Sequence, residues 1–355
     1  MRKMKPAPRS IPSTLIIVLL LAACQKGTEP SSPVERTPRD YTWMIDTLAY
    51  PGSYQTMMGD IWASSPTDVY VVGHNDRGYG KMFHYDGTFW RAVDQVHPDS
   101  QGNASIDLNS VFGFSRTDVW CAGCRMLDNP TPPPSFEHEA LIIHYDGSSW
   151  IDVHVSGSGE LNSLWGSSPT SIWAVGSAGS AFRFDGISWT RISIRDDVSF
   201  KKVWGMNESA VLALGYKLDA EPYDSICAYM FRYNGSTWTL EDSLIENTVD
   251  QSFGIGGIWA TSGIWYSCGY GVFVSNANRW SKVFENGSFI SCIWGISSSD
   301  LFAGGESLYH YNGIDWYPCP VRLPPFANIY GIWADTKEAF AVANDGLRTF
   351  ILHGK

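Results

Sequence analysis

The side chains best suited to redox or metal chemistry are thiols. Six of the seven cysteines lie in the body of the chain: Cys121, Cys124, Cys227, Cys268, Cys292 and Cys319. Cys121-Ala122-Gly123-Cys124 has the spacing of a redox motif or of half a metal site. A redox pair needs a helix N-terminus to lower the thiol pKa, whereas Cys121 stands where Ala174 stands in a similar segment. We therefore expect a small buried thiol or a local disulfide, and the sequence leaves the disulfide pairing open.

Imidazole groups form no catalytic motif either. His84, His144 and His310 occupy one equivalent position in three similar segments. A regular fold would hold them apart, whereas metal ligands lie about 2 Å from one ion. Three other histidines fall in irregular segments and are better candidates: His74, His97 and His138. The chain has no HExxH, phosphate-binding loop or GxSxG pattern, so the sequence predicts no metal, no cofactor and no catalytic residue.

The elements that position these residues are copies of a repeat, best seen from Leu164 to Trp189. This segment, LWGSSPTSIWAVGSAGSAFRFDGISW, opens with an apolar strand, turns through Ser and Pro, and continues as the strand IWAVG. AFRF is a third alternating strand, Asp185-Gly186 is a hairpin signal, and Trp189 begins a fourth strand. Four short antiparallel strands in a repeat of about 40 to 50 residues are typical of a β-propeller blade.

Seven copies follow one another along the chain. They align on a first-strand aromatic residue: Trp62, Phe112, Trp165, Trp204, Trp259, Trp294 and Trp333. The last copy ends before its fourth strand, whereas Trp43 to Leu48 precedes the first copy and alternates like a fourth strand. We therefore predict an all-β, seven-bladed propeller with four antiparallel strands per blade. Pairing of the N-terminal strand with the last blade would close the ring and remove exposed sheet edges.

The 16 tryptophans fit this architecture. Six occupy the first-strand position, and seven begin fourth strands: Trp43, Trp90, Trp150, Trp189, Trp238, Trp280 and Trp316. Trp120 and Trp173 occupy the second strand, and Trp265 falls one residue from that position. We expect these rings to pack between blades rather than to form a glycan-binding platform.

The turn between the third and fourth strands carries a family resemblance. It reads YDGTFW, YDGSSW, FDGISW, YNGSTW and YNGIDW in five copies. This turn resembles that of kelch and Asp-box propellers, and the WGSSPT and WAVG segments resemble repeats of bacterial exported propellers. The resemblance implies the fold alone, because most copies lack the double Gly of kelch blades and the Asp-box spacing is one residue short. A sialidase-type site would need clustered Arg residues, a Tyr nucleophile and an acid, which we do not find.

The N-terminal 40 residues read as an export signal and a tether. Four basic residues precede the apolar run Leu15 to Leu21, which is shorter than the roughly 20 residues of a membrane span. Leu21-Ala22-Ala23-Cys24 resembles the lipobox of bacterial lipoproteins, which implies acylation of Cys24, and Gln25 then implies sorting to the outer membrane, facing the periplasm or the cell surface. The alternative is an ordinary secretory signal. We expect a signal peptide at 1–23, a flexible tether at 24–40 and a single propeller domain at 41–355.

The charge balance restricts the partners. Residues 1–23 hold four of the 25 Lys and Arg residues, which leaves 21 basic against 36 acidic residues and a formal charge of −15. Such acidity disfavours nucleic acid and anionic lipid headgroups as partners. The negative charge favours cationic or neutral ligands, or it simply keeps the protein soluble. The expected contact with a membrane is therefore through the lipid anchor.

Three functions fit the sequence. The first, which the missing motifs favour, is a membrane-anchored binding or scaffold protein of the cell envelope with a protein or glycan partner. The second is a polysaccharide hydrolase or lyase using loop carboxylates: Asp128, Glu137, Glu139, Asp219, Glu221 and Asp224. The third is a lectin-like glycan binder using aromatic residues outside the repeat positions: Tyr79, Tyr216, Tyr223 and Tyr270.

A partner should dock on one particular face of the ring. Turns between first and second and between third and fourth strands are monotonous, whereas the second-to-third connections and the links between blades vary. Variable loops on a rigid scaffold are where binding sites arise. We therefore predict contacts over blades one, two and four, among them Arg77, Tyr79, Glu137, His138, Tyr216 and Asp224. Small or polar residues should line a narrow channel mouth on this face: Asp60, Ser110, Ser163, Lys202, Gly257, Cys292 and Gly331.

Overall fold

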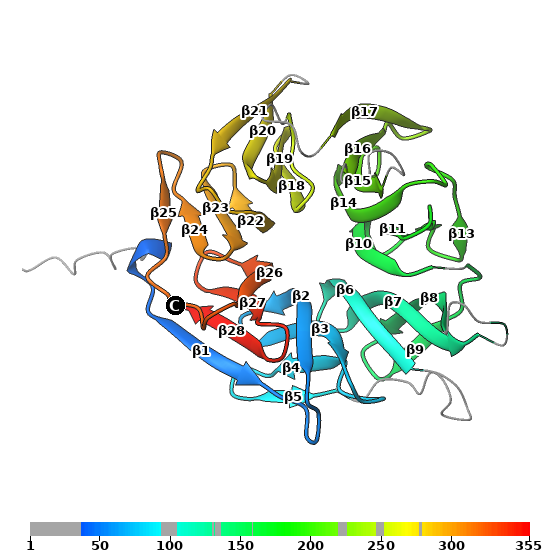
Figure 1. Cartoon of the computed structure of the whole chain (residues 1–355), viewed down its shortest axis with the longest axis horizontal. Coiled ribbons are helices and arrows are strands. Elements are labelled where there is room, and N and C mark those ends of the chain that lie inside the picture. Colours follow the sequence, from blue (N-terminus) through cyan, green and yellow to red (C-terminus); the bar gives the residue numbers. More distant parts are fainter. Residues whose placement is uncertain are drawn as a thin grey trace, which may run out of the picture. The chain divides into compact units, whose positions relative to one another are not determined.

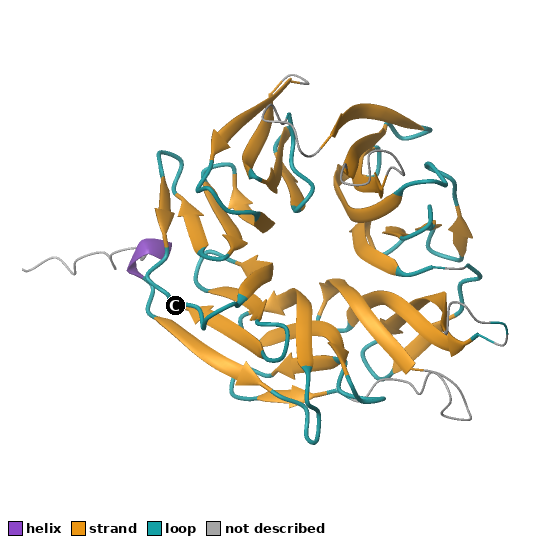
Figure 2. Cartoon of the chain, in the orientation of Figure 1, coloured by secondary structure: helices purple, strands orange, loops and turns teal. Residues whose placement is uncertain are grey.

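The computed structural model describes residues 37–93, 105–129, 131, 136–157, 159–218, 226–245, 252–276 and 279–355. The chain divides into two units, Met1–Glu35 and Arg36–Lys355, and every described residue belongs to the second. Strands and turns make up almost all of it (Figure 2). Its helical element among the described residues is one 3-10 turn, η1 (Pro38–Asp40). No helix in these ranges is long and apolar enough to cross a membrane.

The strands form seven antiparallel sheets of four strands each, set radially around one axis (Figure 1). This confirms the predicted all-β, seven-bladed propeller. Blades 1 to 3 are β2 (Thr56–Ser65), β3 (Asp68–Asn75), β4 (Met82–Tyr85) and β5 (Trp90–Ala92); β6 (Ser105–Ser115), β7 (Asp118–Asp128), β8 (Phe136–Tyr145) and β9 (Trp150–Val153); and β10 (Leu161–Ser168), β11 (Ser171–Gly176), β12 (Ala181–Phe184) and β13 (Trp189–Arg191).

Blades 4 to 6 repeat the same order. They are β14 (Ser199–Asn207), β15 (Ala210–Leu218), β16 (Ile226–Tyr233) and β17 (Trp238–Ile245); β18 (Gly257–Thr261), β19 (Ile264–Gly269), β20 (Gly271–Asn276) and β21 (Arg279–Phe284); and β22 (Ile290–Ser297), β23 (Asp300–Gly305), β24 (Leu308–Tyr311) and β25 (Trp316–Pro318). Blade 7 combines both ends of the described chain: β26 (Asn328–Ala334), β27 (Ala339–Asn344), β28 (Thr349–Gly354) and β1 (Trp43–Leu48).

The N-terminal strand closes the ring as predicted. β1 pairs with β28 over its whole length, from Trp43 opposite Gly354 to Leu48 opposite Thr349. Thr42 and Lys355 extend the ladder with two backbone hydrogen bonds of 2.9 and 3.2 Å. Just before β1, Arg39 forms an ion pair of 2.5 Å with Asp315 of blade 6. Residues Pro38–Asp40, assigned to the tether from sequence, therefore contact the propeller.

The Asp-Gly turns form because one side-chain oxygen satisfies two backbone amides. In blade 3, Asp185 Oδ1 accepts hydrogen bonds of 2.9 Å from the amides of both Ile187 and Ser188. Gly186 has a φ of +93°, which a side chain would strain. Asn234 accepts the equivalent pair of bonds in blade 4. Asp and Asn alternate at this position because both supply the same acceptor.

The first-strand tryptophans of blades 1, 3 and 5 pack on a glycine of the next blade. A Cβ added at Gly113 would lie 2.6 Å from the Trp62 indole, and one at Gly205 would lie 2.3 Å from the Trp165 indole. Gly295 stands in the same relation to Trp259, at 2.5 Å. These close approaches need residues without side chains. Packing between blades, as predicted, accounts for these three tryptophans.

The equivalent histidines lie in separate blades, also as predicted. His84 is stacked on Tyr70 with ring centroids 4.3 Å apart, and its Nε2 lies 2.8 Å from Asp68 Oδ1. His144 makes the same contacts with Trp120 and Asp118, whereas the His310 ring is tilted against Phe302 and its Nε2 lies 2.9 Å from Asp300 Oδ1. In blade 7 the equivalent pair is His353 and Glu338. Each pair ties the third strand to the start of the second, which is a structural role.

No disulfide joins the six cysteines predicted to be exported, all of which lie in the described ranges. Burial raises the pKa of the Cys121 thiol well above its usual value. Burial, with Glu160 and Asp107 nearby, also raises the pKa of Cys124 to about 12. Both groups are therefore protonated at neutral pH, and the CAGC segment is not a redox nucleophile. The expectation of a buried thiol is confirmed, and its alternative, a local disulfide, is not what forms.

Candidate binding site at the channel mouth

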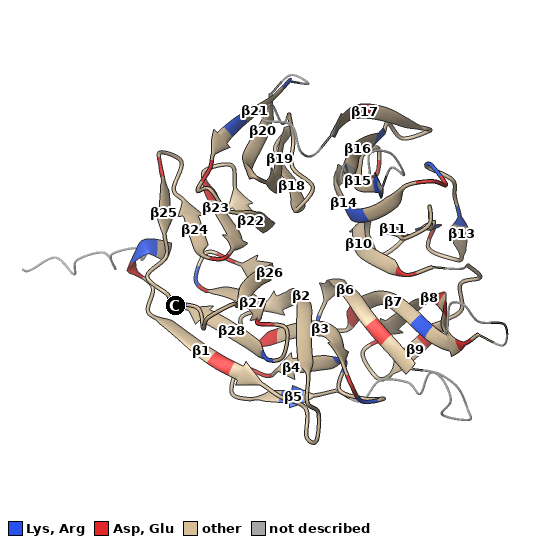
Figure 3. Cartoon of the chain, viewed as in Figure 1, with Lys and Arg blue, Asp and Glu red and all other residues tan. Residues whose placement is uncertain are grey.

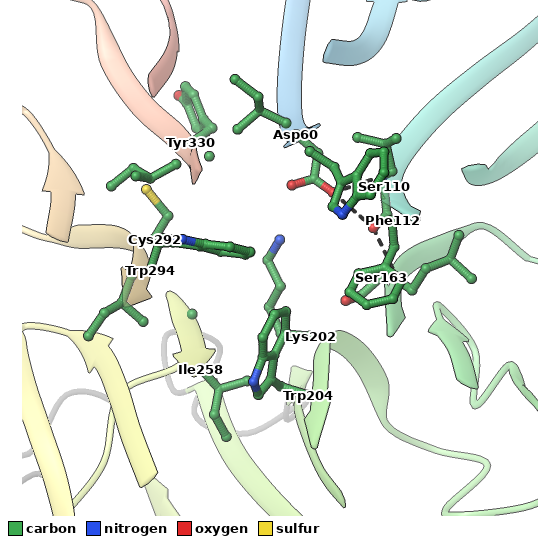
Figure 4. A pocket seen from close by; sticks show the side chains of 18 of the residues that line it. Asp60, Ser110, Phe112, Ser163, Lys202, Trp204, Ile258, Cys292, Trp294 and Tyr330 are labelled. Carbon is green, nitrogen blue, oxygen red and sulfur yellow. Dashed lines mark hydrogen bonds between the residues drawn. The ribbon is translucent and has the colours of Figure 1, made fainter. Parts of the chain in front are cut away.

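The seven first strands bring one residue each to the axis, and these are the seven residues predicted to line the channel mouth: Asp60, Ser110, Ser163, Lys202, Gly257, Cys292 and Gly331. They surround a narrow space of about 70 Å³ (Figure 4). The small side chains follow from the geometry, because seven strands converge there and a larger residue in each would not fit.

Hydrogen bonds fix the side chains of Asp60 and Ser110 on one side of this mouth. Asp60 Oδ2 accepts from the Ser110 hydroxyl at 2.9 Å and from the Val111 amide at 3.0 Å. The Ser110 hydroxyl in turn accepts from the amide of Leu164 at 3.1 Å. Side chains of blade 1 and blade 2 thus bind the backbone of the next blade, and Asp60 is held as an acceptor facing the axis.

Lys202 supplies a positive charge on the other side. Its amine extends toward the axis, across from Asp60 (Figure 4), and the side chain is half-buried. In the ranges that the structure describes, Lys202 makes no ion pair with a carboxylate. An ammonium group in a partly enclosed site gains from an anionic or carbonyl ligand.

Aromatic rings close the channel beyond the polar mouth. Phe112 of blade 2, Trp204 of blade 4 and Trp294 of blade 6 belong to blades that are not neighbours. Their rings nevertheless meet, because centroids of Phe112 and Trp204 lie 6.2 Å apart and those of Trp204 and Trp294 lie 5.7 Å apart. Each ring is two residues further along its strand than the polar residue at the mouth, or about 7 Å. The prediction that all tryptophans pack between blades is therefore incomplete, because the rings of Trp204 and Trp294 meet each other at the axis.

Two wider hollows adjoin the mouth on the predicted face. One, of about 710 Å³, is lined by Asn109, Asn162, Lys201, Lys202, Tyr216, Ile255, Gly256, Phe289, Ser291, Tyr330 and Gly59. The other, of about 510 Å³, shares Gly59, Asn109 and Tyr330 with it and adds His74, Phe326 and residues of the β27–β28 turn. The shared residues make the two hollows and the mouth one continuous surface, which we call the mouth basin.

The mouth basin combines amide, ammonium and aromatic groups. Asn109 and Asn162 each use the side-chain amide to bind a backbone oxygen of the following blade, Leu161 at 3.1 Å and Phe200 at 2.9 Å. Lys201 lies over the Phe289 ring at 5.5 Å. Tyr330 is 39% exposed and Phe326 is 90% exposed. Although the chain is acidic, charged residues are spread over the blades (Figure 3), and the basin holds two adjacent lysines.

The predicted contact residues are only partly brought together. Tyr216 lies in the mouth basin. Arg77 instead contacts the Gly52 carbonyl and lies 5.7 Å from the Tyr54 ring, and the Tyr79 backbone carbonyl accepts a bond from Asn75. Glu137 is exposed on β8, and His138 Nδ1 lies 2.5 Å from Glu160. Asp224 is outside the described residues.

Among the residues that the structure describes, the loop carboxylates and tyrosines of the two alternative functions do not all converge on one site. Glu139 lies 3.4 Å from Arg125 as an ion pair, and Tyr270 contacts Phe289 with ring centroids 5.3 Å apart. Asp128 ends β7. The remaining candidates lie outside the described residues: Asp219, Glu221 and Tyr223.

Several basin residues were missed by sequence reasoning. Asn109, Asn162 and Lys201 each directly precede a predicted mouth residue, so shifting the repeat alignment by one residue would have found them. The sequence gives less indication that Phe289 and Tyr330 line the basin. Phe289 belongs to a link between blades, and Tyr330 lies in a strand that the sequence reads as core.

Comparison with known proteins identifies the fold. No protein-family model and no curated protein matches the chain. The solved structure of YCF48 bound to a D1 peptide is 15% identical, with a TM-score of 0.57 over 90% of this chain and 97% of that one. The WD40 β-propeller domain of Doa1 is also 15% identical, with a TM-score of 0.55 over 88% and 97%. The extracellular domain of BT4673 from B. thetaiotaomicron is 11% identical, with a TM-score of 0.55 over 86% of this chain and 39% of that one.

Proposed function

We propose that this protein is a non-enzymatic binding module that holds an extended peptide segment of a protein partner in the mouth basin. The observation that carries the proposal is that the channel is polar at its mouth and aromatic further along the axis. Polar and charged groups lie open at the mouth, whereas aromatic rings close the channel a few residues further on. A ligand can therefore sit on this face but cannot pass through.

A peptide offers the groups that this surface recognises. Its backbone can hydrogen-bond with the side-chain amides of Asn109 and Asn162, and an acidic side chain can pair with Lys202. Apolar side chains can pack against Phe289 and Tyr330, since aromatic residues supply much of the energy at protein interfaces. The likeness to a propeller described as bound to a D1 peptide supports this choice.

The setting that we propose is the cell envelope. The N-terminal sequence, with its short apolar run and Leu-Ala-Ala-Cys ending, supports attachment to the outer membrane through acylated Cys24. A tether of polar residues would then let the propeller reach partners away from the membrane surface. The proposal needs no catalytic residue, no metal and no nucleic acid.

The test is binding of the purified full chain to arrays of peptides and, in parallel, of glycans. We expect acidic peptides to bind, and we expect Lys202→Ala and Tyr330→Ala to weaken the best peptide by about tenfold each. Phe89→Ser and Ile187→Ser are matched controls, because both residues are exposed on Asp-Gly turns of the opposite face. Their binding should equal that of the unaltered chain.

Three results would contradict the proposal. One is retention of peptide binding in both basin variants while the turn variants lose it, which would place the site on the opposite face. Another is binding of glycans alone. The third is cleavage of a polysaccharide in the same screen, which would favour the hydrolase or lyase alternative. Melting temperatures of all four variants separate lost binding from lost folding.

A further inference from the structure

A group of potential metal ligands lies on blade 2, outside the mouth basin. Cys124 Sγ, a His138 ring nitrogen and a Glu160 carboxylate oxygen lie within 4.8 Å of one another. They come from three separate segments: β7, β8 and the residue immediately before β10. The sequence predicted no metal, although it noted Cys124 for a spacing seen in half a metal site and His138 as one of the better candidates among the histidines.

Strand pairing places the first two ligands on one face of the sheet. Cys124 is opposite Ala140 and Met126 is opposite His138, so Cys124 and His138 are diagonal neighbours on the same side of the β7–β8 ladder. The thiol is 2% exposed. The His138 side chain is 38% exposed, so an ion could reach the buried thiol past the imidazole ring.

Backbone hydrogen bonds hold the third ligand against them. The Gly159 amide donates to the His138 carbonyl at 2.8 Å, and the Ala140 amide donates to the Gly157 carbonyl at 3.0 Å. On the other side, Ser177 binds both backbone groups of Glu160, its hydroxyl accepting from the amide and its amide donating to the carbonyl, at 2.8 Å each. Glu160 is thus fixed between blades 2 and 3, with its carboxylate 2.5 Å from His138 Nδ1.

The basic side chains near this group are paired with other carboxylates. Asp107 is paired with the buried amine of Lys81 at 3.1 Å, and Arg125 is paired with Glu139 and Asp152. Within the described ranges Glu160 has no Lys or Arg partner, and its ion pair is with His138. A metal ion that displaces the Cys124 proton on binding would meet a thiolate, a carboxylate and a neutral imidazole, whose two negative charges one divalent ion balances.

We propose that Cys124, His138 and Glu160 bind one transition-metal ion, with Zn²⁺ as the physiological candidate. A sulfur, a nitrogen and an oxygen ligand suit Zn²⁺, whereas Ca²⁺ and Mg²⁺ prefer oxygen ligands alone. Tetrahedral bonds of 2.0 to 2.3 Å separate ligand atoms by roughly 3.5 Å, so side-chain rotations are enough to form the site. The exposed side of His138 and Glu160 leaves a fourth position for water or a partner's ligand.

The test uses the purified, metal-free full chain and Co²⁺ as a spectroscopic probe. We expect one equivalent of Co²⁺ to produce a thiolate-to-cobalt charge-transfer band, which Zn²⁺ then abolishes. Cys124→Ser should remove the band, and His138→Gln and Glu160→Gln should weaken Co²⁺ binding by at least about tenfold. Glu137→Gln, beside His138, and Cys227→Ser, another thiol, are the matched controls and should bind like the unaltered chain.

A second measurement covers the case in which Cys124→Ser fails to fold. Zn²⁺ should slow the alkylation of Cys124 in the unaltered chain, as followed by mass spectrometry of the peptide that contains it. Absence of saturable Co²⁺ binding would overturn the proposal. So would a band that survives in Cys124→Ser, an equal loss in the controls, or an alkylation rate that Zn²⁺ does not change. These results are independent of whether a peptide binds the mouth basin.

Discussion

Asp68 shows how one buried carboxylate makes the stability of a blade depend on pH. Burial raises its pKa, but hydrogen bonds from His84 and Ser64 outweigh burial and hold the pKa below its usual value. A carboxyl group whose pKa is lowered by folding stabilises the fold above its unfolded pKa, about 3.9, and this contribution is lost as the pH falls through the folded value. We expect Asp68→Asn to cost about 1 kcal/mol at pH 7 because charge-assisted bonds become neutral ones.

The measurement is urea unfolding from pH 7 down to the acid transition. The difference between Asp68→Asn and the unaltered chain should begin to shrink as the pH falls below about 3.9 and should vanish below the lower pKa of folded Asp68, where both side chains are neutral. Asp46→Asn, which removes an exposed carboxylate from β1, is the control and should leave the curve nearly unchanged. Identical curves for the two variants would show that the Asp68–His84 pair contributes nothing.

Position in the repeat predicted which side chains reach the axis, but not what the aromatic rings do there. All seven mouth residues were found because each stands two residues before the first-strand aromatic. Trp165 and Trp204 occupy the same repeat position, yet the first packs on Gly205 and the second meets Trp294 at the axis. The sequence around each residue gives no signal for this difference, because the space at the axis is shared among rings from several blades.

At the scale of elements, β1 is a short strand that should make a large contribution to the free energy of unfolding. Its Trp43 ring packs on the blade 7 core, and a Cβ at Gly354 would lie 2.8 Å from the indole. We expect Trp43→Ala to cost about 3 kcal/mol through lost burial and a cavity. Ile45→Ala, on the same strand but 38% exposed, should change the free energy of unfolding by no more than about 0.5 kcal/mol.

Deletions test the same closure more severely. Removing residues 40–50 should lower the melting temperature far more than removing residues 25–35, because only the first deletion takes away the strand paired with β28. The second deletion stops short of Arg39, which contacts Asp315. Similar melting temperatures for the two truncated chains would mean that blade 7 is stable with three strands.

Element boundaries were less predictable than element types. The sequence predicts an irregular segment around His138, yet β7 and β8 pair beyond it as far as Asp128 opposite Phe136. Prolines disfavour strand pairing, so the sequence NPTPPP predicts an interruption of the strands, but it does not show how far the flanking residues pair. This error hid the group formed by Cys124, His138 and Glu160, because Cys124 and His138 become neighbours only when the hairpin is extended.

At the scale of the molecule, the two faces of the propeller differ in how strictly they repeat. Repeated Asp-Gly turns on one face satisfy their own backbone groups, as Asp185 does. The opposite face carries the mouth basin, the extended β7–β8 hairpin and the group formed by Cys124, His138 and Glu160. The repeat pattern predicted this separation, because only one set of connections varies. It could not predict the basin itself, which forms where residues from all blades converge.

The last prediction concerns whether a lipid anchor attaches the whole protein to a membrane. If Leu21-Ala22-Ala23-Cys24 is a lipobox, acylation of Cys24 anchors a chain whose acidity would repel it from anionic headgroups. Stable attachment then depends on the lipid chains, since one chain alone binds reversibly and two bind firmly. Cys24→Ser should abolish labelling by a fatty-acid analogue and leave a larger, unprocessed precursor, as seen by electrophoresis of cell fractions. Cys227→Ser should be labelled and processed normally. Equal labelling of Cys24→Ser would refute the assignment by placing the acyl group on another residue, whereas no labelling of either chain would mean that the N-terminus is an ordinary secretory signal.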